Sequence, residues 1–461
     1  MSKSPAYLHE VFAGRYDLIA MLDNFAEHFP YLLETTASPS DSQTNNFDIL
    51  FAYPQQQLIK HPDESVTMDG VVCSSQVFLD ELDKVWKKDA IDSEIASELP
   101  FSGGWFVYLG YELVNEIEPT VAINQTYDSL PIAFATRIPA AVIYDHAQDQ
   151  THVLVEDEFK NLLDEITSKL IKTESLTAIP NEPLVYEVDE EPDNVYVESV
   201  EKILCFIHEG DVFQVNLSRQ WEAVLKETAS DIDLYRQLRI ANPAPYSAIA
   251  KFNQTSIVSS SPERLFRRNN NKIETRPIAG TRPRGLTSDT DTELQSELIS
   301  NFKERAEHIM LIDLERNDLG RICKPGSIEV DEFMVLESYA HVHHIVSNVS
   351  GELQESITPG QIIKAIFPGG TITGCPKVRC MEIITELEKS QRGAYTGSLG
   401  FLNRNGDMDL NILIRSLTLN GNRVIFRAGA GIVADSIPLN ELAETRAKAK
   451  GMLVALQGMD A

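Results

Sequence analysis

The sequence has little basic charge, few cysteines and no long hydrophobic run. Its 461 residues carry 40 Lys and Arg against 69 Asp and Glu, which gives a formal net charge of −29 at pH 7. Phosphate backbones are bound by clustered positive charge, so this balance argues against nucleic-acid binding. No apolar stretch is long enough to span a bilayer, and the first residues, MSKSPAYLHEVFAG, lack an apolar signal core. We therefore expect a cytoplasmic protein that binds neither nucleic acid nor membranes.

The cysteines are five in number, scattered along the chain, and include no CxxC pair. This usage argues against a zinc site and against a disulfide framework, and it favours a reducing compartment. The chain also lacks a Walker A loop, because no Gly-Lys-Ser/Thr follows its glycine-rich segments at the required spacing.

The order of the apolar runs predicts an α+β fold with antiparallel β-sheets. Near the C-terminus, β-like runs follow one another directly and are separated by Asn-Gly at 405–406 and 420–421. Asn-Gly between such runs is typical of a hairpin. Helices are expected over Val77–Lys88, Val195–Glu209, Glu293–Asp313, Lys377–Glu388 and Leu439–Leu456. The Pro- and acid-rich segment 175–194 predicts a linker or surface crossing between an N-terminal lobe, 1–175, and a C-terminal region, 195–461.

Two segments are rich in glycine and cationic side chains. FPGGTITGCPKVRCMEIITELE (367–388) predicts a turn leading into a helix that starts at Pro376, where free N–H groups, Lys377 and Arg379 would hold a carboxylate or phosphate. The alternative is a tight turn before an ordinary helix. In ETRPIAGTRPRG (274–285) three arginines could grip an anion, or the segment is a surface turn.

Several acidic residues occupy positions that invite chemistry. Glu307 shares an apolar helix face with Met310 and Leu311, so its carboxylate must be paired, protonated or bound to metal unless it reaches water at the edge of that face. Glu441 and Glu444 lie along one face of the last helix, as a solvated stripe or as part of a hard-cation site.

Glu263, in SPERLF, follows a strand and would act as a general acid if its pKa were raised; the alternative is the first turn of a helix. In YAHVHHIVSNV, His341 and His343 share one face of a strand and His344 points to the other. Histidine pairs in strands can ligate metal, although such residues more often form hydrogen bonds.

Taken together, these segments resemble the chorismate-utilising enzymes, the family of anthranilate synthase component I, aminodeoxychorismate synthase component I and the isochorismate and salicylate synthases. The resemblance covers residues 200–450 most strongly, and it rests on FQVNLSR (213–219), SPERLF (261–266), TRPIAGTRPRG (275–285), RAEHIMLIDLERNDLGR (305–321), VHHIVSNVSG (342–351), PGGTITGCPKVRCMEII (368–384), GAGIVADS (429–436) and ELAETRAKAK (441–450). It implies antiparallel β-sheets packed as a sandwich with helices outside.

The resemblance also implies roles for individual residues. Glu263 matches the general acid that protonates the departing 4-hydroxyl, and His344 matches a histidine on the leaving-group side. Glu304, Glu307, Glu441 and Glu444 match carboxylates that hold Mg²⁺, the implied cofactor, beside the C1 carboxylate of the ring. Residues implied in substrate binding or closure over the ring are Ala279, Gly280, Thr281, Gly370, Thr371, Thr373, Tyr395, Arg415, Gly429, Ala430, Gly431 and Lys448.

Gln214 stands where water-using members carry a lysine base. Ammonia needs no strong base, so the resemblance favours amination, with ammonia supplied by a glutamine amidotransferase partner because this chain has no GxCxGxQ motif. NNFDILFAYP, NPAPYSAIAKF and GGTITG are similar to aminodeoxychorismate synthase, and we expect that activity. Ala279 is the anthranilate-type residue where described aminodeoxychorismate synthases have lysine, so anthranilate synthase is the alternative. LLETT (32–36) is similar to a tryptophan-sensing motif, so a tryptophan in the N-terminal lobe is a further expectation.

Overall fold

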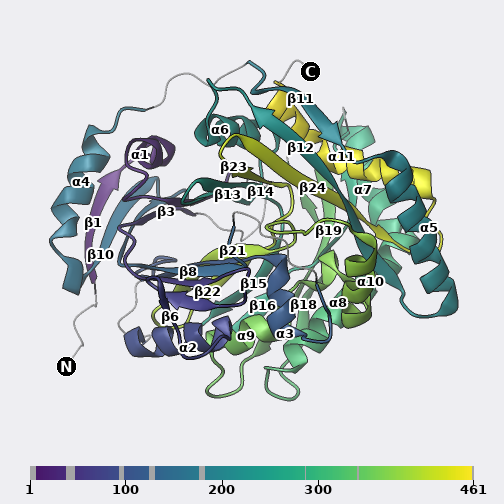
Figure 1. Ribbon diagram of the computed structural model, residues 1–461, viewed down its shortest axis with the longest axis horizontal. Helices are drawn as coiled ribbons and strands as arrows, with labels where there is room; N and C mark the ends of the chain where they lie inside the picture. Colours follow the sequence, from purple (N-terminus) through teal and green to yellow (C-terminus); the bar gives the residue numbers. More distant parts are fainter. Residues whose placement is uncertain are drawn as a thin grey trace.

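Two large antiparallel sheets face each other at the centre of the molecule (Figure 1). The computed structural model describes residues 7–37, 47–92, 98–123, 130–175, 182–285, 287–339 and 342–458. Every strand pair in these ranges that forms a ladder is antiparallel, and helices lie outside the sheets, which confirms the predicted α+β sandwich.

The first sheet contains twelve strands. In spatial order they are β1 (Tyr7–Ala13), β10 (Gln150–Glu156), β9 (Ala140–Asp145), β3 (Phe47–Ala52), β2 (Tyr31–Glu34), β13 (Tyr246–Phe252), β14 (Thr255–Ser261), β23 (Ser416–Asn420), β24 (Arg423–Ile432), β12 (Gln214–Leu225) and β11 (Val185–Glu190), with β20 (Gly374–Cys375) paired to β12.

The second sheet also contains twelve strands. Their order is β17 (Ile278–Pro283), β19 (Val342–Glu352), β16 (Lys272–Thr275), β15 (Arg264–Asn269), β22 (Met408–Asn411), β21 (Ser398–Asn403), β7 (Gly104–Leu109), β8 (Ala133–Ile138), β4 (Gln57–Lys60), β5 (Val66–Met68) and β6 (Val71–Val72), with β18 (Glu329–Ser338) paired to β19.

Both sheets combine strands from the two sides of segment 175–194. In the first sheet β2 pairs with β13, and in the second β7 pairs with β21. The predicted division into 1–175 and 195–461 therefore does not coincide with a division between the sheets. Aromatic side chains join the sheets at the centre: the Tyr31 ring of β2 stacks on the Phe106 ring of β7 with centroids 4.0 Å apart, a contact worth about 0.5–1.5 kcal/mol beyond the area that it buries.

The helices cover the outer faces and the ends of the sandwich (Figure 1). α11 packs against α6 and β24, and α2 packs against α9 and β4. The helices are α1 (Leu18–Asn24), α2 (Phe78–Asp89), α3 (Val114–Ile117), α4 (Leu162–Lys172), α5 (Asp193–Glu209), α6 (Asp231–Ala241), α7 (Ser288–Ser300), α8 (Phe302–Gly320), α9 (Pro359–Ile366), α10 (Lys377–Leu387) and α11 (Pro438–Gln457), with short 3₁₀ turns η2 (Tyr111–Leu113), η3 (Asp157–Phe159) and η4 (Gly370–Ile372).

Most of the expected elements are confirmed, and two details are wrong. The Asn-Gly pairs close the hairpins β21–β22 and β23–β24, with Gly406 and Gly421 at φ of 89° and 59°. The single helix expected over 293–313 is instead two, α7 and α8, because the chain turns at Asn301, whose side-chain oxygen accepts a hydrogen bond from the Glu304 N–H. Pro376 precedes α10 as its cap residue, so the first helical residue is Lys377.

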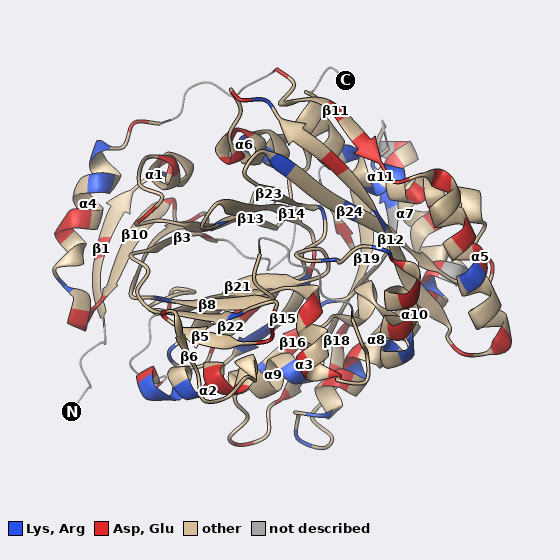
Figure 2. Ribbon diagram, in the orientation of Figure 1, with Lys and Arg blue, Asp and Glu red and all other residues tan. Residues whose placement is uncertain are grey.

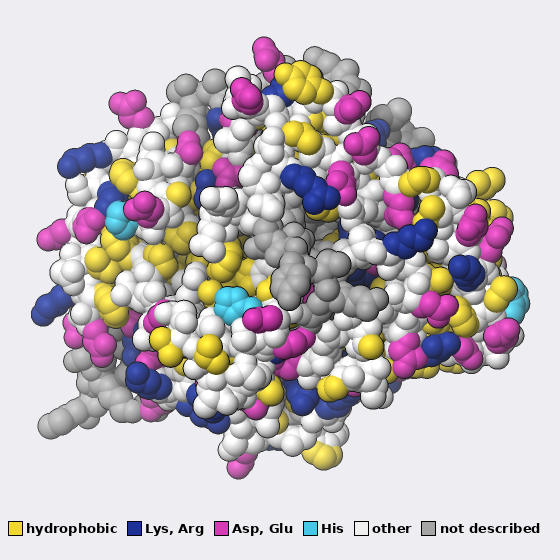
Figure 3. Space-filling model, viewed as in Figure 1, with side chains coloured by type: hydrophobic (Ala, Val, Ile, Leu, Met, Phe, Trp, Pro, Cys, Tyr) yellow, Lys and Arg dark blue, Asp and Glu magenta, His cyan; other side chains and the backbone are white. Residues whose placement is uncertain are grey.

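Charge lies mainly on the outer helices, whereas the central strands are largely uncharged (Figure 2). Figure 3 shows acidic and basic side chains interspersed over one face of the molecule. In the described ranges, no helix combines the length and apolar character needed to cross a bilayer.

Candidate active site

A cavity of about 160 Å³, partly open to solvent, lies where the second half of the first sheet meets β17, β19 and α11. Seven of the residues expected in the site line it: Glu263, His344, Thr371, Tyr395, Arg415, Gly429 and Lys448. These residues come from segments spread over nearly 200 positions, and the fold alone brings them together.

Glu263 lies between β14 and β15, so the alternative of a helix N-terminus is wrong. Its side chain is 6% exposed, and Oε1 accepts a hydrogen bond of 2.8 Å from the Thr371 hydroxyl in η4. Burial raises the pKa of Glu263 to about 7, although the Thr371 hydrogen bond favours the ionised form and acts in the opposite direction. Near neutral pH this carboxyl therefore carries a proton that it can give to a ligand.

His344 enters the cavity from β19, and its ring is 3% exposed. Burial, assisted by the nearby Arg415 charge, lowers the pKa of His344 to about 4, so the ring is neutral at physiological pH. Its Nδ1 lies 3.4 Å from the Gly280 carbonyl oxygen, which is an acceptor only. That contact places the ring proton on Nδ1 and leaves Nε2 as a hydrogen-bond acceptor. His343 points away and contacts Asp291, whereas His341 lies outside the described residues.

Three cationic side chains line the cavity, and Glu263 is the one carboxylic acid among the described residues that do so. Arg427 is engaged by Glu388 and Ser218, and Lys448 lies 2.8 Å from Glu444. In the ranges that the structure describes, no side chain or carbonyl forms an ion pair or hydrogen bond with the Arg415 guanidinium, and burial lowers its pKa. The wall therefore offers uncompensated positive charge to an anionic ligand within a protein of net charge −29.

A buried ion pair braces the glycine-rich turn from behind. The Arg392 guanidinium is 1% exposed and donates to Glu388 at 2.7 Å, to the Ile372 carbonyl at 3.1 Å and to the Asn216 carbonyl at 2.8 Å. Burial alone would raise the pKa of Glu388, but Arg392 and Arg427 lower it. Since Asn216, Ile372 and Arg427 all line the cavity, the Arg392–Glu388 pair fixes three parts of the cavity wall relative to one another.

The glycine-rich turn itself divides into a part that faces the cavity and a part that does not. Thr371 lines the cavity, whereas Thr373 is fully buried and donates to the Gly369 carbonyl at 2.9 Å. Behind Gly370, Leu314 and Glu315 of α8 approach so closely that a Cβ at Gly370 would lie 2.4 Å from Leu314 Cδ2. Thr373 and Gly370 therefore shape the turn and do not line the cavity.

The remaining predicted substrate-binding residues are not among the described residues that line the cavity. Ala279 and Gly280 lie on β17 beside Ile278, which lines it, while of Thr281 only the backbone is described. Gly280 has φ of 65°, and a Cβ there would lie 2.9 Å from Glu304 Oε2. Ala430 is buried in the core, and Gly431 lies next to Gln214 on the paired strand β12.

The four carboxylates predicted to hold Mg²⁺ lie on α8 and α11. Glu304 pairs with Arg282 at 3.2 Å and Glu444 with Lys448 at 2.8 Å, while Glu441 is 8% exposed and Glu307 is half-buried. In the described part of the chain no three His, Cys, Asp or Glu side chains are gathered as a metal cluster. The carboxylate oxygens of the four glutamates are of the type that a hard cation prefers. The Mg²⁺ site stays a prediction.

In the two segments rich in cationic residues, 274–285 and 367–388, the charged side chains form ion pairs with carboxylates of the protein. Arg276, Arg282 and Arg284 pair with Glu337, Glu297 and Asp291, at 2.6, 3.1 and 2.9 Å. Lys377 binds Asp318, and Arg379 binds Asp211 and Glu382. These side chains are thus engaged by carboxylates of the protein, and the interpretation of either segment as an anion grip stays a prediction. Among the described residues that line the cavity, Arg415 is the cation for which no ion pair with a described residue is found.

Sequence reasoning missed part of the wall, notably Asn216, Ile278, Ile372, Arg427 and Met452. For two of them a signal existed. Asn216 is two residues after Gln214 and Arg427 two before Gly429, so each shares a strand face with a residue already expected in the site. The apolar residues carry no such signal, because any buried aliphatic side chain has the same pattern.

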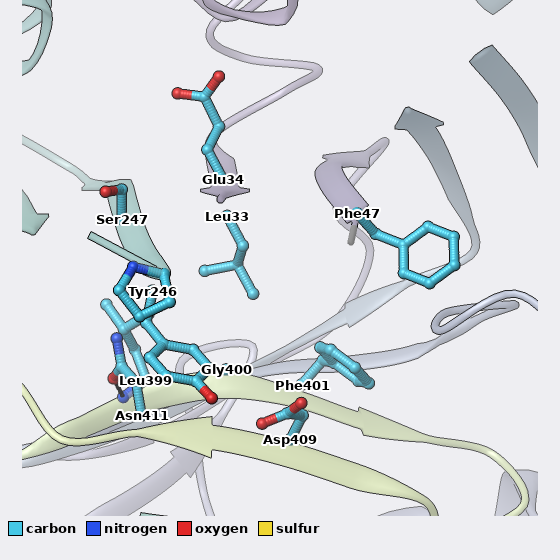
Figure 4. A pocket seen from close by; sticks show the side chains of 11 residues that line it. Leu33, Glu34, Phe47, Tyr246, Ser247, Leu399, Gly400, Phe401, Asp409 and Asn411 are labelled. Atoms are coloured by element: carbon cyan, nitrogen blue, oxygen red, sulfur yellow. Dashed lines mark hydrogen bonds between the residues drawn. The ribbon is translucent and has the colours of Figure 1, made fainter. Parts of the chain in front are cut away.

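A second, smaller cavity lies between the two sheets (Figure 4). Leu33 of the LLETT segment points into it, toward Gly400 and Phe401 of β21, whereas Glu34 points to the other side of its strand. Glu34 accepts hydrogen bonds from Tyr235 at 2.6 Å and Arg239 at 3.2 Å. This cavity is where the N-terminal strands meet the C-terminal region.

Comparison with known proteins agrees with this arrangement. The family model described as chorismate binding enzyme matches residues 36–454. This chain is a chorismate-binding enzyme. An anthranilate synthase component I-like protein of Synechocystis sp. is 42% identical over 375 residues, which cover 80% of this chain and 76% of that protein. Aminodeoxychorismate synthase component 1 of Bacillus subtilis is 40% identical over 418 residues, 87% of this chain and 85% of that protein.

Among solved structures, anthranilate synthase component I from Streptococcus pneumoniae superposes on this chorismate-binding enzyme with a TM-score of 0.79 at 33% identity, and the match covers 90% of this chain and 93% of that one. The menaquinone-specific isochorismate synthase from Escherichia coli, at 16% identity and a TM-score of 0.75, shares the fold. Relatives named for different reactions thus match almost equally well, and what they share is the family.

Proposed function

We propose that this enzyme is the chorismate-aminating subunit of aminodeoxychorismate synthase, which replaces the 4-hydroxyl of chorismate by an amino group. The observation that carries the proposal is one cavity containing a buried carboxylic acid, Glu263, whose pKa is about 7, and a guanidinium, Arg415, that no described residue pairs. Chorismate is a dianion with a poor leaving group. It needs both a cation to bind its carboxylate and an acid to protonate the departing hydroxyl.

The neutral His344 complements that acid. Its Nε2 is an acceptor, so it can receive a hydrogen bond from a hydroxyl on the ring without placing a second positive charge near Arg415. The Tyr395 hydroxyl, whose pKa burial raises to about 12, remains a donor at all physiological pH values. These two groups would orient the ring, while Thr371 holds the Glu263 carboxyl in place.

We further propose that Glu307 and Glu444, with Glu304 and Glu441 one turn away on their helices, would hold a Mg²⁺ ion. A hard divalent cation there would neutralise one substrate carboxylate and offset the acidity of the chain. The Glu304–Arg282 and Glu444–Lys448 pairs would exchange partners when the ion and substrate enter.

Amination is favoured over addition of water by Gln214 and by the lack of a suitable base among the described residues that line the cavity. The one carboxyl among them is Glu263, which the proposal uses as the acid, and His344 is too weak a base at a pKa of about 4. Water would need deprotonation to attack, whereas ammonia attacks as it is. We propose that a glutamine amidotransferase subunit supplies the ammonia.

Anthranilate synthase is the second candidate, and Ala279 favours it. The residue is 8% exposed on β17 and carries no nucleophile, so the covalent route through a lysine at this position is closed to this chain. Amination at C4 then requires another group, or water, to make the first displacement. Anthranilate formation requires amination at C2 followed by elimination of pyruvate.

Product analysis tests the proposal. The purified chain would be incubated with chorismate, MgCl₂ and an ammonium salt, and the products separated by chromatography with and without an added aminodeoxychorismate lyase. We expect a product that yields p-aminobenzoate only when the lyase is present. Anthranilate fluorescence without lyase would establish the second candidate instead, and isochorismate would overturn amination altogether.

The expected tryptophan would have to enlarge the small cavity beside Leu33, which has room for about 20 Å³ (Figure 4). Calorimetric titration of the chain with tryptophan, compared with phenylalanine, tests it. Binding of tryptophan that Leu33→Arg abolishes would support the site, and equal heats for both amino acids would contradict it.

A further inference from the structure

Two amide side chains on β12 carry oxygen atoms that nothing in the described structure binds. Gln214 Oε1 and Asn216 Oδ1 are both fully shielded from solvent, and neither has a hydrogen-bond donor among the described residues. A buried acceptor without a donor costs about 1–3 kcal/mol, so two of them on one strand beside a cavity call for an explanation. Being two residues apart, they lie on the same face of β12.

Glycines make room for both side chains. On the neighbouring strand β24, a Cβ at Gly431 would lie 2.3 Å from Gln214 Nε2, and a Cβ at Gly429 would lie 2.9 Å from Asn216 Oδ1. The two glycines, which have no side chain, therefore leave space next to the β24 backbone, and the two amide side chains lie in that space.

The orientation of Asn216 follows from its neighbour. Asn216 Nδ2 lies 3.5 Å from the Thr371 carbonyl oxygen, which can only accept. Turning the amide over would place two oxygens against each other, so Oδ1 is the atom that lies beside Gly429 of β24. Asn216 lines the cavity, and Gln214 lies behind it toward the start of β12, where Phe213 is 67% exposed.

We propose that these two oxygens are successive acceptor positions for ammonia, with Gln214 the outer one and Asn216 the inner one beside the ring. The inference rests on the proposed amination. Ammonia carries three N–H donors and one lone pair, so it can donate to an amide oxygen and still present the lone pair to a ring carbon. Asn216 is thereby assigned a substrate contact that its family motif did not identify.

The cationic side chains that line the cavity favour neutral ammonia over the ammonium ion. Arg415, Arg427 and Lys448 face the same cavity, so they disfavour entry of ammonium. Water could donate to the same oxygens, but an amide oxygen is too weak a base to take its proton, and water held there would remain a poor nucleophile.

The chemistry balances with the groups already described. Water first adds at C2 as the C4 hydroxyl leaves with the Glu263 proton, and the proton released from the attacking water returns to Glu263. The ammonia lone pair then forms the C–N bond at C4 while the C2 C–O bond breaks, and the Glu263 proton leaves with that hydroxyl as water. The new alkylammonium group then returns one proton to the Glu263 carboxylate. The sum is chorismate plus ammonia giving the aminated ring plus water, without an oxidant or reductant.

The test is Asn216→Leu, which keeps the size of the side chain and removes the acceptor. With ammonium chloride as nitrogen source and chorismate saturating, we expect its KM for ammonium to rise by about tenfold or more, the equivalent of one lost hydrogen bond. The dissociation constant for chorismate, measured by fluorescence titration without ammonia, should stay unchanged. Asn216→Asp, which keeps an acceptor of the same shape, should retain a KM closer to that of wild type.

Asn420→Leu, the same change at the exposed end of β23, is the matched control. An unchanged ammonium KM in Asn216→Leu would overturn the inference and mean that these oxygens hold water only. An equal loss of chorismate affinity would also overturn it, because Asn216 would then contact the ring substrate. If Asn216→Leu does not fold, Gln214→Leu serves the same comparison. A wild-type enzyme that does not aminate chorismate would defeat the proposed function itself, which is a separate result.

Discussion

The Thr371 hydroxyl lies 2.8 Å from Oε1 of Glu263 and donates a hydrogen bond to it. This bond joins the glycine-rich turn to the one carboxylic acid among the described residues that line the cavity, and it acts against burial on the pKa of that acid. The pKa of Glu263 is thereby kept near neutral pH. The carboxyl is protonated in enough molecules to act as a donor, and it ionises readily once it has given up its proton.

Removing that hydrogen bond should move the pH profile of the reaction. If Glu263 must be protonated, activity falls as pH rises through about 7. In Thr371→Val the ionised form loses a donor, so the pKa of Glu263 rises and the alkaline limb moves to higher pH by about one unit. Thr371→Ser keeps the donor and should leave the limb in place. A limb that stays fixed in both variants, measured as kcat/KM for chorismate against pH, would rule out Glu263 as the acid.

Replacing the Arg415 guanidinium, which no described residue pairs, should weaken substrate binding. In Arg415→Gln we expect the dissociation constant for chorismate to rise by about 10–100-fold, since a charge-assisted hydrogen bond contributes about 1.5–3 kcal/mol. Arg423→Gln is the control, because Arg423 pairs with Glu222 on the surface, 2.8 Å away. If Arg415 acted only on its neighbour Glu263, the dissociation constant would not change and only the alkaline limb would move. Fluorescence titration and a pH profile separate the two outcomes.

The buried pair Arg392–Glu388 should matter far more to stability than an exposed pair of the same type. Arg392→Met leaves the Glu388 carboxylate buried with part of its hydrogen bonding lost, which costs about 3–5 kcal/mol. Arg423→Met removes a pair whose side chains are 54% and 38% exposed, and this change should cost no more than about 1 kcal/mol. Urea unfolding followed by circular dichroism measures both. Equal losses in the two variants would show that the Arg392 network adds nothing beyond a surface pair.

Glu315 on α8 should make the protein less stable as pH rises. Burial, and then the neighbouring Asp318, raises the pKa of Glu315 to about 8 in the folded protein, whereas an unfolded glutamate titrates near about 4.3. Between these pH values the folded chain holds a proton that the unfolded chain releases, so the free energy of unfolding decreases as pH rises, by an amount on the order of a few kcal/mol.

Glu315→Gln removes this titration and should lose less stability between pH 5 and pH 8 than wild type does. Glu386→Gln, an exposed glutamate on α10, should follow the wild-type curve. Urea midpoints at the two pH values give the comparison. A slope for Glu315→Gln as steep as that of wild type would mean that the Glu315 carboxyl is ionised throughout.

Local patterns in the sequence were enough to predict the fold class and most of the helices and strands. The alternation of apolar residues, the Asn-Gly turns and the glycine after Glu209 depend on neighbours in the chain, so hairpins and helix ends could be read without coordinates. The family motifs likewise placed Glu263, His344, Thr371 and Arg415 in one site, and the cavity contains all four.

Other features depended on residues far apart in the chain. Arg276, Arg282 and Arg284 are paired, while Arg415 has no ion pair among the residues that the structure describes, and this difference depends on which carboxylates the two sheets bring within reach. The raised pKa of Glu263 and the unpartnered oxygens of Gln214 and Asn216 depend on burial, which is a property of the packed molecule. The sequence by itself determined which strands, helices and reactive side chains are present. Only the tertiary structure decided which charges cancel, because electrostatic interactions and desolvation depend on distances in space and not on distances along the chain.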